Sequence, residues 1–235
     1  LKEYVKGAGE ARDLMVTEFA FAAYAWKNGL RQIPQPIGCD RERNLGLFEF
    51  IAGRRALAQD VNDGTIHEIL EFLLSLNHNR RLVDAQSLGK AREACFTFNA
   101  HFEAVGRRLR ELKAMPGNTV LDKEAYLFVR DELEPAWKKT QGWVLERART
   151  AQLDLDQKLP ELERVLSPGD LGFHSLLLAN DNRSRFIDFE YAGWDDPARV
   201  LCDLFCRTDS PVPIVHFNHF TRSLAELSAN PESLL

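Results

Sequence analysis

Residues 165–199 constrain what this chain can fold into more than any other stretch. They contain two short apolar runs, residues 176–179 and 185–189, separated by the turn-forming sequence Asn-Asp-Asn-Arg-Ser. Two such runs around such a cluster are typical of a β-hairpin. Asp170 precedes the first run and Asp188 falls near the end of the second. Because a hairpin brings its outer ends together, we expect these two carboxylates to be near neighbours.

Two neighbouring carboxylates beside a glycine-containing loop can divide the work of phosphoryl transfer. One can hold a divalent cation, because hard cations prefer oxygen ligands. The other can accept a proton from an attacking hydroxyl. Phosphoryl transfer needs little more from a protein than positioning and charge neutralisation. A purely structural interpretation stays open, since an isolated Asp is often a turn residue, and Asp196 before Pro197 is typical of a helix start.

Two strings in this stretch resemble motifs of the aminoglycoside phosphotransferase and choline kinase family. I-D-F-E-Y-A-G-W-D-D-P, at 187–197, is similar to the family's metal-binding motif, and S-P-G-D-L-G-F-H-S-L-L, at 167–177, is similar to its catalytic loop. The resemblance implies a protein-kinase-like fold, ATP and Mg²⁺ as cofactors, and a small-molecule hydroxyl as phosphate acceptor. It also implies that Asp170 is the catalytic base and that Asp188 binds Mg²⁺.

The chain departs from the family's pattern at two positions of the catalytic loop. Pro168 replaces the His of H-G-D, and Ser175 stands where the family has an Asn that binds a second metal ion. A serine hydroxyl can bind Mg²⁺, although it is shorter and less polar than an amide, and the adjacent His174 offers an imidazole, a poor Mg²⁺ ligand. We therefore expect Ser175 in the second metal position, and a catalytically weakened homologue is an alternative.

The N-terminal residues predict a strand followed by a helix. Residues 1–5 are expected to form the strand, 6–9 a turn, and 10–28 a helix closed by Gly29. Glu18 falls on the apolar stripe of that helix, and a buried carboxylate needs a partner, for which Lys2 is the candidate. The resemblance implies that Lys2 and Glu18 form the pair that orients the ATP phosphates. A surface salt bridge of little energetic value is the alternative.

Residues 45–51 alternate as a strand does, and Gly53 ends the pattern. The resemblance implies that this strand leads into the hinge between two lobes. The backbone at Glu49 and Ile51 is then expected to meet the adenine ring. An ordinary sheet strand is compatible with the same pattern.

The middle of the chain predicts long helices. Residues 63–77 have apolar side chains at helical spacing, and residues 122–151 are expected to be helical, interrupted or restarted at Pro135. Between them runs a heptad-type seam, which favours a central helix in a bundle over a coiled-coil dimer. Residues 197–207 and 214–228 are expected to form the last two helices. The seam consists of Leu88, Ala91, Cys95, Phe98, Phe102, Val105, Leu109 and Leu112.

Composition excludes several classes of protein. The 235 residues carry a formal net charge of −5, which argues against a nucleic-acid binder with a basic surface. No apolar run approaches the ~18 residues of a membrane span. We interpret the four cysteines as reduced, mostly buried thiols of a cytoplasmic protein. A zinc site combining Cys202 and Cys206 with His216 and His219 is not favoured, because the chain has no C-x-x-C pair.

These observations predict an α+β, protein-kinase-like fold with two lobes. Residues 1–52 are expected to be part of an N-terminal sheet lobe, because the chain begins at the lysine strand without a glycine-rich loop before it. Residues 53–235 are expected to form a mostly helical lobe. The predicted function is ATP- and Mg²⁺-dependent phosphorylation of a small-molecule hydroxyl. The alternatives are a weakened homologue that binds a nucleotide or a partner, and a helical interaction protein that uses the heptad seam.

Overall fold

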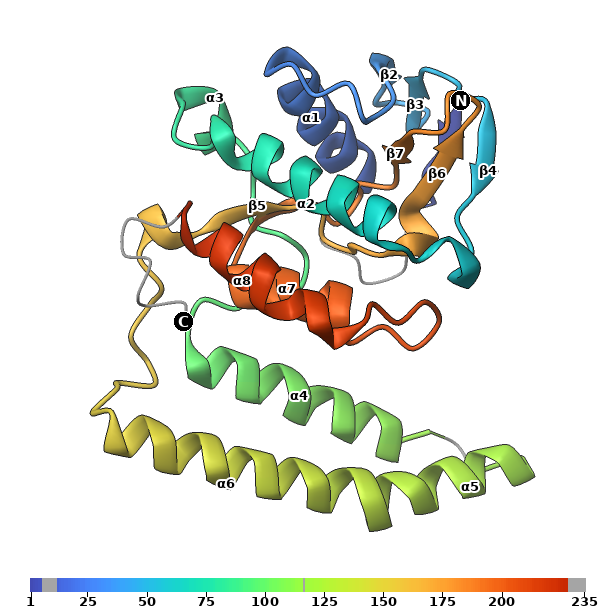
Figure 1. Cartoon of the computed structure of the whole chain (residues 1–235). Coiled ribbons are helices and arrows are strands. Elements are labelled where there is room, and N and C mark those ends of the chain that lie inside the picture. Colours follow the sequence, from blue (N-terminus) through green and yellow to red (C-terminus); the bar gives the residue numbers. More distant parts are fainter. Residues whose placement is uncertain (6–11, 116, 228–235) are drawn as a thin grey trace. The chain divides into compact units, whose positions relative to one another are not determined.

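The computed structural model describes residues 1–5, 12–115 and 117–227, which form helices and small antiparallel sheets (Figure 1). The mixed α+β class expected from the sequence is confirmed. The predicted turn at 6–9 and the predicted helix ends at Glu10 and Ser228 lie outside the described residues, as does Pro116. The strands are β1 (Lys2–Glu3), β2 (Pro36–Asp40), β3 (Leu45–Phe48), β4 (Gly53–Arg55), β5 (Val165–Ser167), β6 (Leu176–Ala179), β7 (Ser184–Phe186) and β8 (Gly193–Asp195).

In the part of the chain that the structure describes, the strands form three sheets, in the orders β1-β3-β2, β4-β6-β7 and β5-β8. The α-helices are α1 (Leu14–Lys27), α2 (Asp63–His78), α3 (Val83–Gln86), α4 (Phe98–Lys113), α5 (Val120–Phe128), α6 (Glu134–Thr150), α7 (Pro197–Phe205) and α8 (Phe217–Ala225). Short 3-10 turns are η1 (Ala58–Asp60), η3 (Glu161–Glu163), η4 (Phe173–Ser175) and η5 (Ile214–His216).

The chain divides into two compact units, residues 1–94 together with 160–235, and residues 95–159. All three sheets belong to the first unit. The boundary predicted at residue 52 divides the chain in a different way, inside the first unit, and it stays a prediction.

The hairpin predicted at 176–189 is present as β6 and β7. Leu176 pairs with Phe186 and Leu178 with Ser184. The strand ends earlier than expected, at Phe186, so Asp188 lies two residues beyond it. The Phe186 ring stacks on Phe72 of α2, with ring centroids 4.0 Å apart. This contact fixes the hairpin against the core of the first unit.

Helix α1 covers the β1-β3-β2 sheet by packing on β2 and β3. Its N-cap is Asp13, whose side chain accepts a hydrogen bond from the Val16 N–H at 2.9 Å. The predicted closure by Gly29 agrees with the left-handed backbone there, with φ at 90°. The strand expected over 45–51 ends at Phe48, and the Glu49 N–H instead donates to the Gln35 carbonyl at 2.8 Å.

Helix α2 forms where the sequence predicts a helix over 63–77. Its cap is Asn62, whose side chain accepts from the N–H groups of Gly64 and Thr65. Near its C-terminal end the buried Asn77 exchanges two hydrogen bonds with the Leu166 backbone, at 3.0 and 2.7 Å. These bonds hold β5, and so the start of the predicted catalytic loop, against α2.

The heptad seam is wrong as a prediction of one continuous helix. Helix α4 begins only at Phe98, after an N-cap at Thr97, and Leu88, Ala91 and Cys95 precede it. The cause is tertiary: the Ala91 N–H donates to the Trp194 carbonyl at 2.8 Å, and the Trp194 N–H donates to the Gly89 carbonyl at 2.9 Å. This pairing with β8 takes the backbone groups that a helix would need.

The second unit is helical. The π-helical segment η2 (Val129–Leu133) joins α5 to α6, so the helix continues from residue 120 to residue 150 (Figure 1). Pro135 sits in the first turn of α6, directly after the π-helical segment. At the predicted restart, the helix changes from π-helical to α-helical without a break in the chain's helical course. Phe102 of α4 and Trp137 of α6 pack edge to face at 5.8 Å.

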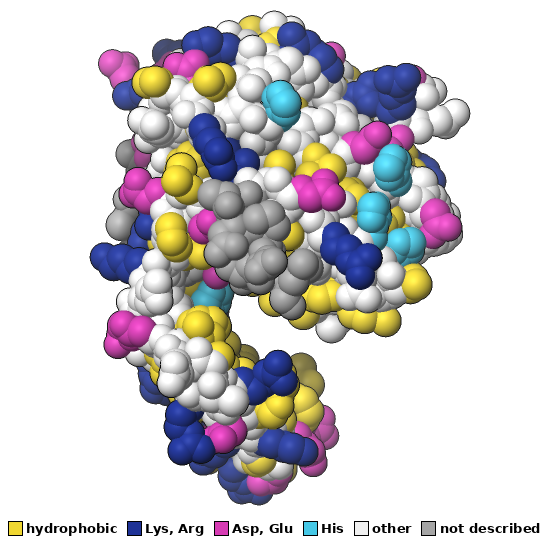
Figure 2. Space-filling view, turned by 60° about the vertical axis from the view of Figure 1, so that its left-hand side comes forward, with side chains coloured by type: hydrophobic (Ala, Val, Ile, Leu, Met, Phe, Trp, Pro, Cys, Tyr) yellow, Lys and Arg dark blue, Asp and Glu magenta, His cyan; other side chains and the backbone are white. Residues whose placement is uncertain are grey.

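Near the C-terminus, Asp196 caps α7 by accepting from the Ala198 N–H at 2.8 Å, and Pro197 is the first helical residue, as predicted. The cysteines are free, as expected, but the expectation that most are buried is wrong, because only Cys95 is. Over the described residues, the helices are too short or too polar to span a membrane. Figure 2 shows acidic, basic and apolar side chains interspersed over one face.

Candidate active site

A pocket of about 350 Å³ lies in the first unit, and three of the predicted site residues line it. It is bounded by β1, α1, the end of β3 and the segment after β7. Ligand pockets in proteins commonly have a volume of this order. Its lining comprises Lys2, Glu18, Ala22, Pro34, Phe48, Arg55, Ile187, Asp188, Phe189 and Glu190.

The Lys2 ammonium lies among three carboxylates. Its Nζ is 2.7 Å from Glu18 Oε2, 2.6 Å from Asp188 Oδ1 and 3.1 Å from Glu190 Oε2. The ion pair expected between Lys2 and Glu18 is therefore present. Burial alone would lower the pKa of Lys2, but the charges of Glu18 and Asp188 outweigh it, so that the pKa is raised.

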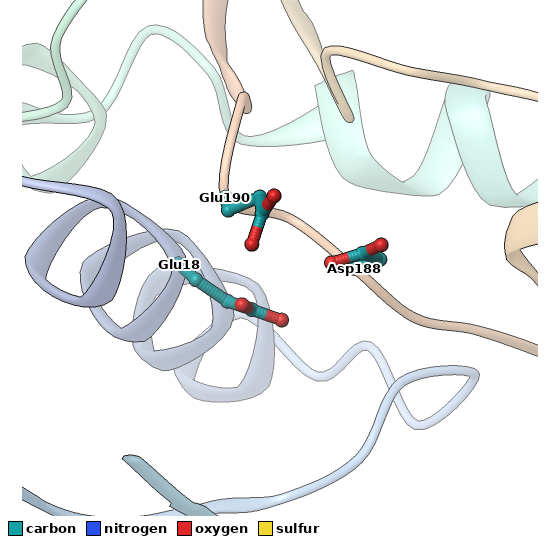
Figure 3. Close-up of side chains that lie close together, drawn as sticks. All are labelled: Glu18, Asp188 and Glu190. Atoms are coloured by element: carbon teal, nitrogen blue, oxygen red, sulfur yellow. The ribbon is translucent and has the colours of Figure 1, made fainter. Parts of the chain in front are cut away.

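The three carboxylates come from two parts of the chain and point toward one another (Figure 3). Glu18 projects from α1, whereas Asp188 and Glu190 follow β7. One oxygen of each lies within 4.8 Å of the others. Glu190 is a residue that sequence reasoning missed, although its spacing two residues after Asp188 could have indicated a shared direction. Three converging carboxylates supply the oxygen ligands that Mg²⁺ prefers.

Glu18 is buried, and both of its carboxylate oxygens are occupied. Oε2 accepts from Lys2 Nζ and from the Tyr4 hydroxyl at 2.6 Å, and Oε1 accepts from the Phe189 N–H at 3.2 Å. Glu18 therefore connects β1, α1 and the segment that carries Asp188. A carboxylate with this many donors is fixed in orientation.

Asp188 presents its side chain from a strained backbone. Its φ is 73°, in the left-handed region, where residues other than glycine are uncommon. Its side chain is 52% exposed, against 7% for that of Glu18. Directly before it, the Ile187 N–H donates to the Ser175 carbonyl at 3.0 Å. The turn thus directs an accessible carboxylate toward the pocket.

Asp170 has a different set of neighbours, and they are basic. Its Oδ1 lies 3.0 Å from Arg207 Nη1, and its Oδ2 lies 3.2 Å from His174 Nε2. The hydrogen bond from His174 and, with smaller effect, the charge of Arg207 lower the pKa of Asp170 against the opposing effect of burial. Arg207 is a second residue that the sequence did not indicate, because it lies 37 residues further along.

Ser175 joins the two aspartates through the backbone. Its hydroxyl donates to the Asp170 carbonyl at 3.3 Å, and its own carbonyl accepts from Ile187. The serine is buried. The outer ends of the hairpin are therefore connected, as predicted, whereas the proximity of the two carboxylate groups themselves stays a prediction.

The backbone geometry at Gly169 explains why the predicted catalytic loop has a glycine before Asp170. Its φ is 84°, and a Cβ built on it would lie 2.1 Å from the Tyr191 carbonyl oxygen. No side chain fits that gap. The loop can therefore approach the segment after Asp188 closely.

The predicted adenine contacts lie beside the pocket. Phe48 lines it, while Glu49 and Ile51 follow Phe48 along the chain and are outside its lining. Glu49 and Gln35 are joined twice, through the Glu49 N–H and through the Glu49 carboxylate, which accepts from the Gln35 N–H at 3.1 Å. The contact of Glu49 and Ile51 with adenine stays a prediction.

A model of the phosphotransferase enzyme family matches residues 5–222 of the chain. No curated protein sequence matches it.

Solved structures with similar folds include a choline/ethanolamine kinase family protein from Mesorhizobium loti (TM-score 0.54, 16% identity) and a spectinomycin phosphotransferase in complex with ADP and spectinomycin (TM-score 0.57, 13% identity). An aminoglycoside phosphotransferase from Alicyclobacillus acidocaldarius is also similar (TM-score 0.51, 14% identity). The matches cover 92%, 94% and 97% of this chain but only 62%, 65% and 66% of those structures. The protein-kinase-like fold expected from the sequence is thereby confirmed.

Proposed function

The chain belongs to the phosphotransferase enzyme family, and we propose that it transfers a phosphoryl group from ATP to a hydroxyl of a small molecule, with Mg²⁺ as cofactor. The observation that carries this proposal is the position of Lys2, held among Glu18, Asp188 and Glu190 at the wall of a pocket. A cation fixed beside accessible carboxylates suits a ligand that brings both phosphates and a metal ion.

Lys2 and Glu18 act as a unit in this proposal. The Lys2 ammonium binds phosphate oxygens of the nucleotide, and Glu18 keeps the lysine side chain directed into the pocket. The backbone at Glu49 and Ile51 binds the adenine ring, beside the apolar wall that includes Phe48. These contacts position the phosphate chain and neutralise part of its charge.

Asp188 and Glu190 are the residues that would hold Mg²⁺, with Ser175 as the candidate ligand of a second ion. The carboxylates of Asp188 and Glu190 are suitable ligands for a hard cation. Asp188 is half-exposed, so it can exchange its contact with Lys2 for a contact with the cation. Bound Mg²⁺ supplies charge neutralisation on the phosphates.

Asp170 is the proposed catalytic base. Its carboxylate accepts the proton of the acceptor hydroxyl as that oxygen attacks phosphorus. Arg207 and His174 hold one carboxylate oxygen each, which fixes the carboxylate plane. One lone pair of each oxygen stays available for the hydroxyl.

The direct test is a screen for acceptor-dependent ATP consumption by the purified protein, over amino alcohols, aminoglycosides and sugars, with and without Mg²⁺. We expect one class of acceptor to stimulate ATP consumption only when Mg²⁺ is present. Binding of ADP without consumption of ATP for any acceptor would instead support the second candidate function.

That second candidate is a weakened homologue that binds nucleotide without transferring phosphate. One observation favours it: the Ser175 side chain is buried and donates its proton to the Asp170 carbonyl, which restricts the directions from which a second metal ion could reach the hydroxyl oxygen. Both functions use the same nucleotide site, and they differ in whether the phosphoryl group is transferred to an acceptor.

A further inference from the structure

We propose that Tyr4 is a positioning residue for nucleotide binding, which it supports by holding the Glu18 carboxylate and the Lys2 ammonium in one fixed arrangement. The inference rests on the proposed function, because it assigns a role to Tyr4 within the same nucleotide site. Tyr4 does not line the pocket, so it acts through its neighbours.

Tyr4 contacts both members of the ion pair. Its hydroxyl donates to Glu18 Oε2 at 2.6 Å, the same oxygen that accepts from Lys2 Nζ at 2.7 Å. The Lys2 ammonium also lies 4.9 Å from the centre of the Tyr4 ring, within the range of a cation–π contact. One side chain therefore restrains the carboxylate by a hydrogen bond and the ammonium by its ring.

The strand geometry explains how Tyr4 reaches this position. Lys2 and Tyr4 are two residues apart, and side chains at that spacing point to the same side of an extended chain. The Tyr4 backbone is fixed by Asn44, whose carbonyl accepts the Tyr4 N–H at 3.0 Å and whose amide donates to the Tyr4 carbonyl at 2.7 Å. The turn between β2 and β3 therefore fixes the backbone from which the Tyr4 ring projects.

Without the Tyr4 hydroxyl, the Glu18 carboxylate would keep Lys2 and the Phe189 N–H as partners, but it would lose one of the three donors that fix its orientation. The tyrosine is only 5% exposed, so water cannot easily take its place. Lys2 would then be drawn more freely toward Asp188 and Glu190, which compete with phosphate for the same ammonium.

The experiment compares Tyr4→Phe with Tyr24→Phe. Tyr24, on α1, is buried to the same 5%, and among the described residues its hydroxyl has no hydrogen-bond partner. Both variants remove one buried hydroxyl and keep the ring. The measurement is the dissociation constant of MgADP by calorimetry, together with the melting temperature of each variant.

We expect Tyr4→Phe to weaken MgADP binding about three- to tenfold, the size of one ordinary net hydrogen bond, while Tyr24→Phe leaves it unchanged. In a Glu18→Gln background the effect of Tyr4→Phe should shrink, because the two residues act together. A Tyr4→Phe protein that melts earlier but binds MgADP like the parent would show a merely structural role and overturn the inference.

A second readout needs no variant. The ring resonances of Tyr4 in the parent protein should shift during titration with MgADP, whereas those of Tyr24 should not. Unshifted Tyr4 resonances at saturation overturn the inference and leave the proposed function intact. A parent protein that binds no MgADP overturns both.

Discussion

The carboxylates at the two ends of the β6–β7 hairpin have opposite surroundings. Asp188 shares one ammonium, that of Lys2, with Glu18 and Glu190, so its neighbourhood keeps an excess of negative charge. Asp170 lies between Arg207 and His174, so its own charge is compensated. The proposed function assigns these two aspartates different chemistry, and their different neighbours are the reason.

In the proposed function, the two aspartates serve two different substrates: Asp188 serves the nucleotide with its cation, and Asp170 serves the acceptor hydroxyl. A surplus of negative charge attracts a divalent cation and the phosphates that accompany it. A compensated and fixed carboxylate stays ionised at neutral pH and accepts a proton only when a hydroxyl is placed against it. Variants at either end should therefore have separable effects on nucleotide binding and on transfer.

The largest effect is expected from Asp170→Asn, which keeps the shape of the side chain and removes its charge. Turnover with the acceptor found by the screen should fall by about 10²–10⁴-fold, the usual contribution of a general base. Nucleotide affinity should barely change, because the proposed function places Asp170 against the acceptor and not against the nucleotide. Steady-state kinetics and ADP binding measure the two quantities separately.

Asp209→Asn is the matched control for this variant. Asp209 lies 3.7 Å from Arg207 Nε and is exposed, so its substitution perturbs the same arginine without touching the base. We expect less than a threefold change in turnover. Equal losses of turnover in the two variants would mean that Asp170 contributes only its negative charge near Arg207 and does not act as a base.

Lys2→Gln should have the next largest effect. Three carboxylates would lose their shared cation, which should destabilise the protein by about 1–3 kcal/mol, allowing for the partial exposure of Lys2. Nucleotide affinity should fall as well. Urea unfolding and ADP binding are the measurements.

Lys27→Gln provides the comparison for Lys2→Gln, because within the described ranges Lys27 forms an ion pair with Asp84 alone, and both side chains are well exposed. The free energy of unfolding should change by less than about 1 kcal/mol. If the two lysine variants prove equally stable and bind ADP alike, the cluster around Lys2 is an ordinary surface salt bridge.

Asp195 extends the comparison of Asp170 with Asp188, because it lies in the same stretch of residues 165–199 but is buried. Burial raises its pKa to about 7 from an ordinary value of 3.8. Between about pH 4 and pH 7 the folded protein therefore holds a proton that the unfolded chain has lost, and the contribution of this group to stability falls as the pH rises. Asp195→Asn should remove that dependence.

The measurement is urea unfolding of the parent and of Asp195→Asn at pH 5 and pH 8. From pH 5 to pH 8 the free energy of unfolding of the variant should rise by about 2–3 kcal/mol relative to that of the parent. Asp181→Asn is the control, because the Arg183 N–H and Arg185 lower the pKa of Asp181, so that this aspartate is ionised at both pH values. A parent protein equally stable at pH 5 and pH 8 would contradict the assignment.

The smallest effect is expected at Ser175. Ser175→Ala removes one hydrogen bond to the Asp170 carbonyl, and it should reduce stability by about 0.5–1.5 kcal/mol and turnover by less than tenfold. Ser175→Asn should raise turnover or metal affinity if the position binds a second ion. Two variants that match the parent would remove Ser175 from the list of metal ligands.

Local patterns in the sequence predicted much of this site. The hairpin follows from its turn residues, the α7 cap follows from Asp196 before Pro197, and the pairing of Lys2 with Glu18 follows from a carboxylate on an apolar helix face. The first two features are determined by residues that are close in sequence. The third follows because a buried carboxylate is costly unless it has a partner.

Long-range contacts account for what the sequence did not predict. The heptad spacing through Ala91 suggested a helix, but backbone pairing with Trp194, about a hundred residues away, took its hydrogen bonds. Arg207, which follows α7, reaches Asp170 across 37 residues of sequence, and Glu190, which follows β7, reaches Lys2 near the N-terminus. No periodicity within the chain encodes such encounters.

The most direct test of the division between the two aspartates is ADP binding to the parent, Asp188→Asn and Asp170→Asn, each with and without Mg²⁺. We expect Mg²⁺ to strengthen ADP binding to the parent and to Asp170→Asn by the same factor, and to have little effect on Asp188→Asn. If Asp188→Asn keeps the full Mg²⁺ effect, or if Asp170→Asn loses it, the two ends of the hairpin do not have the roles assigned to them.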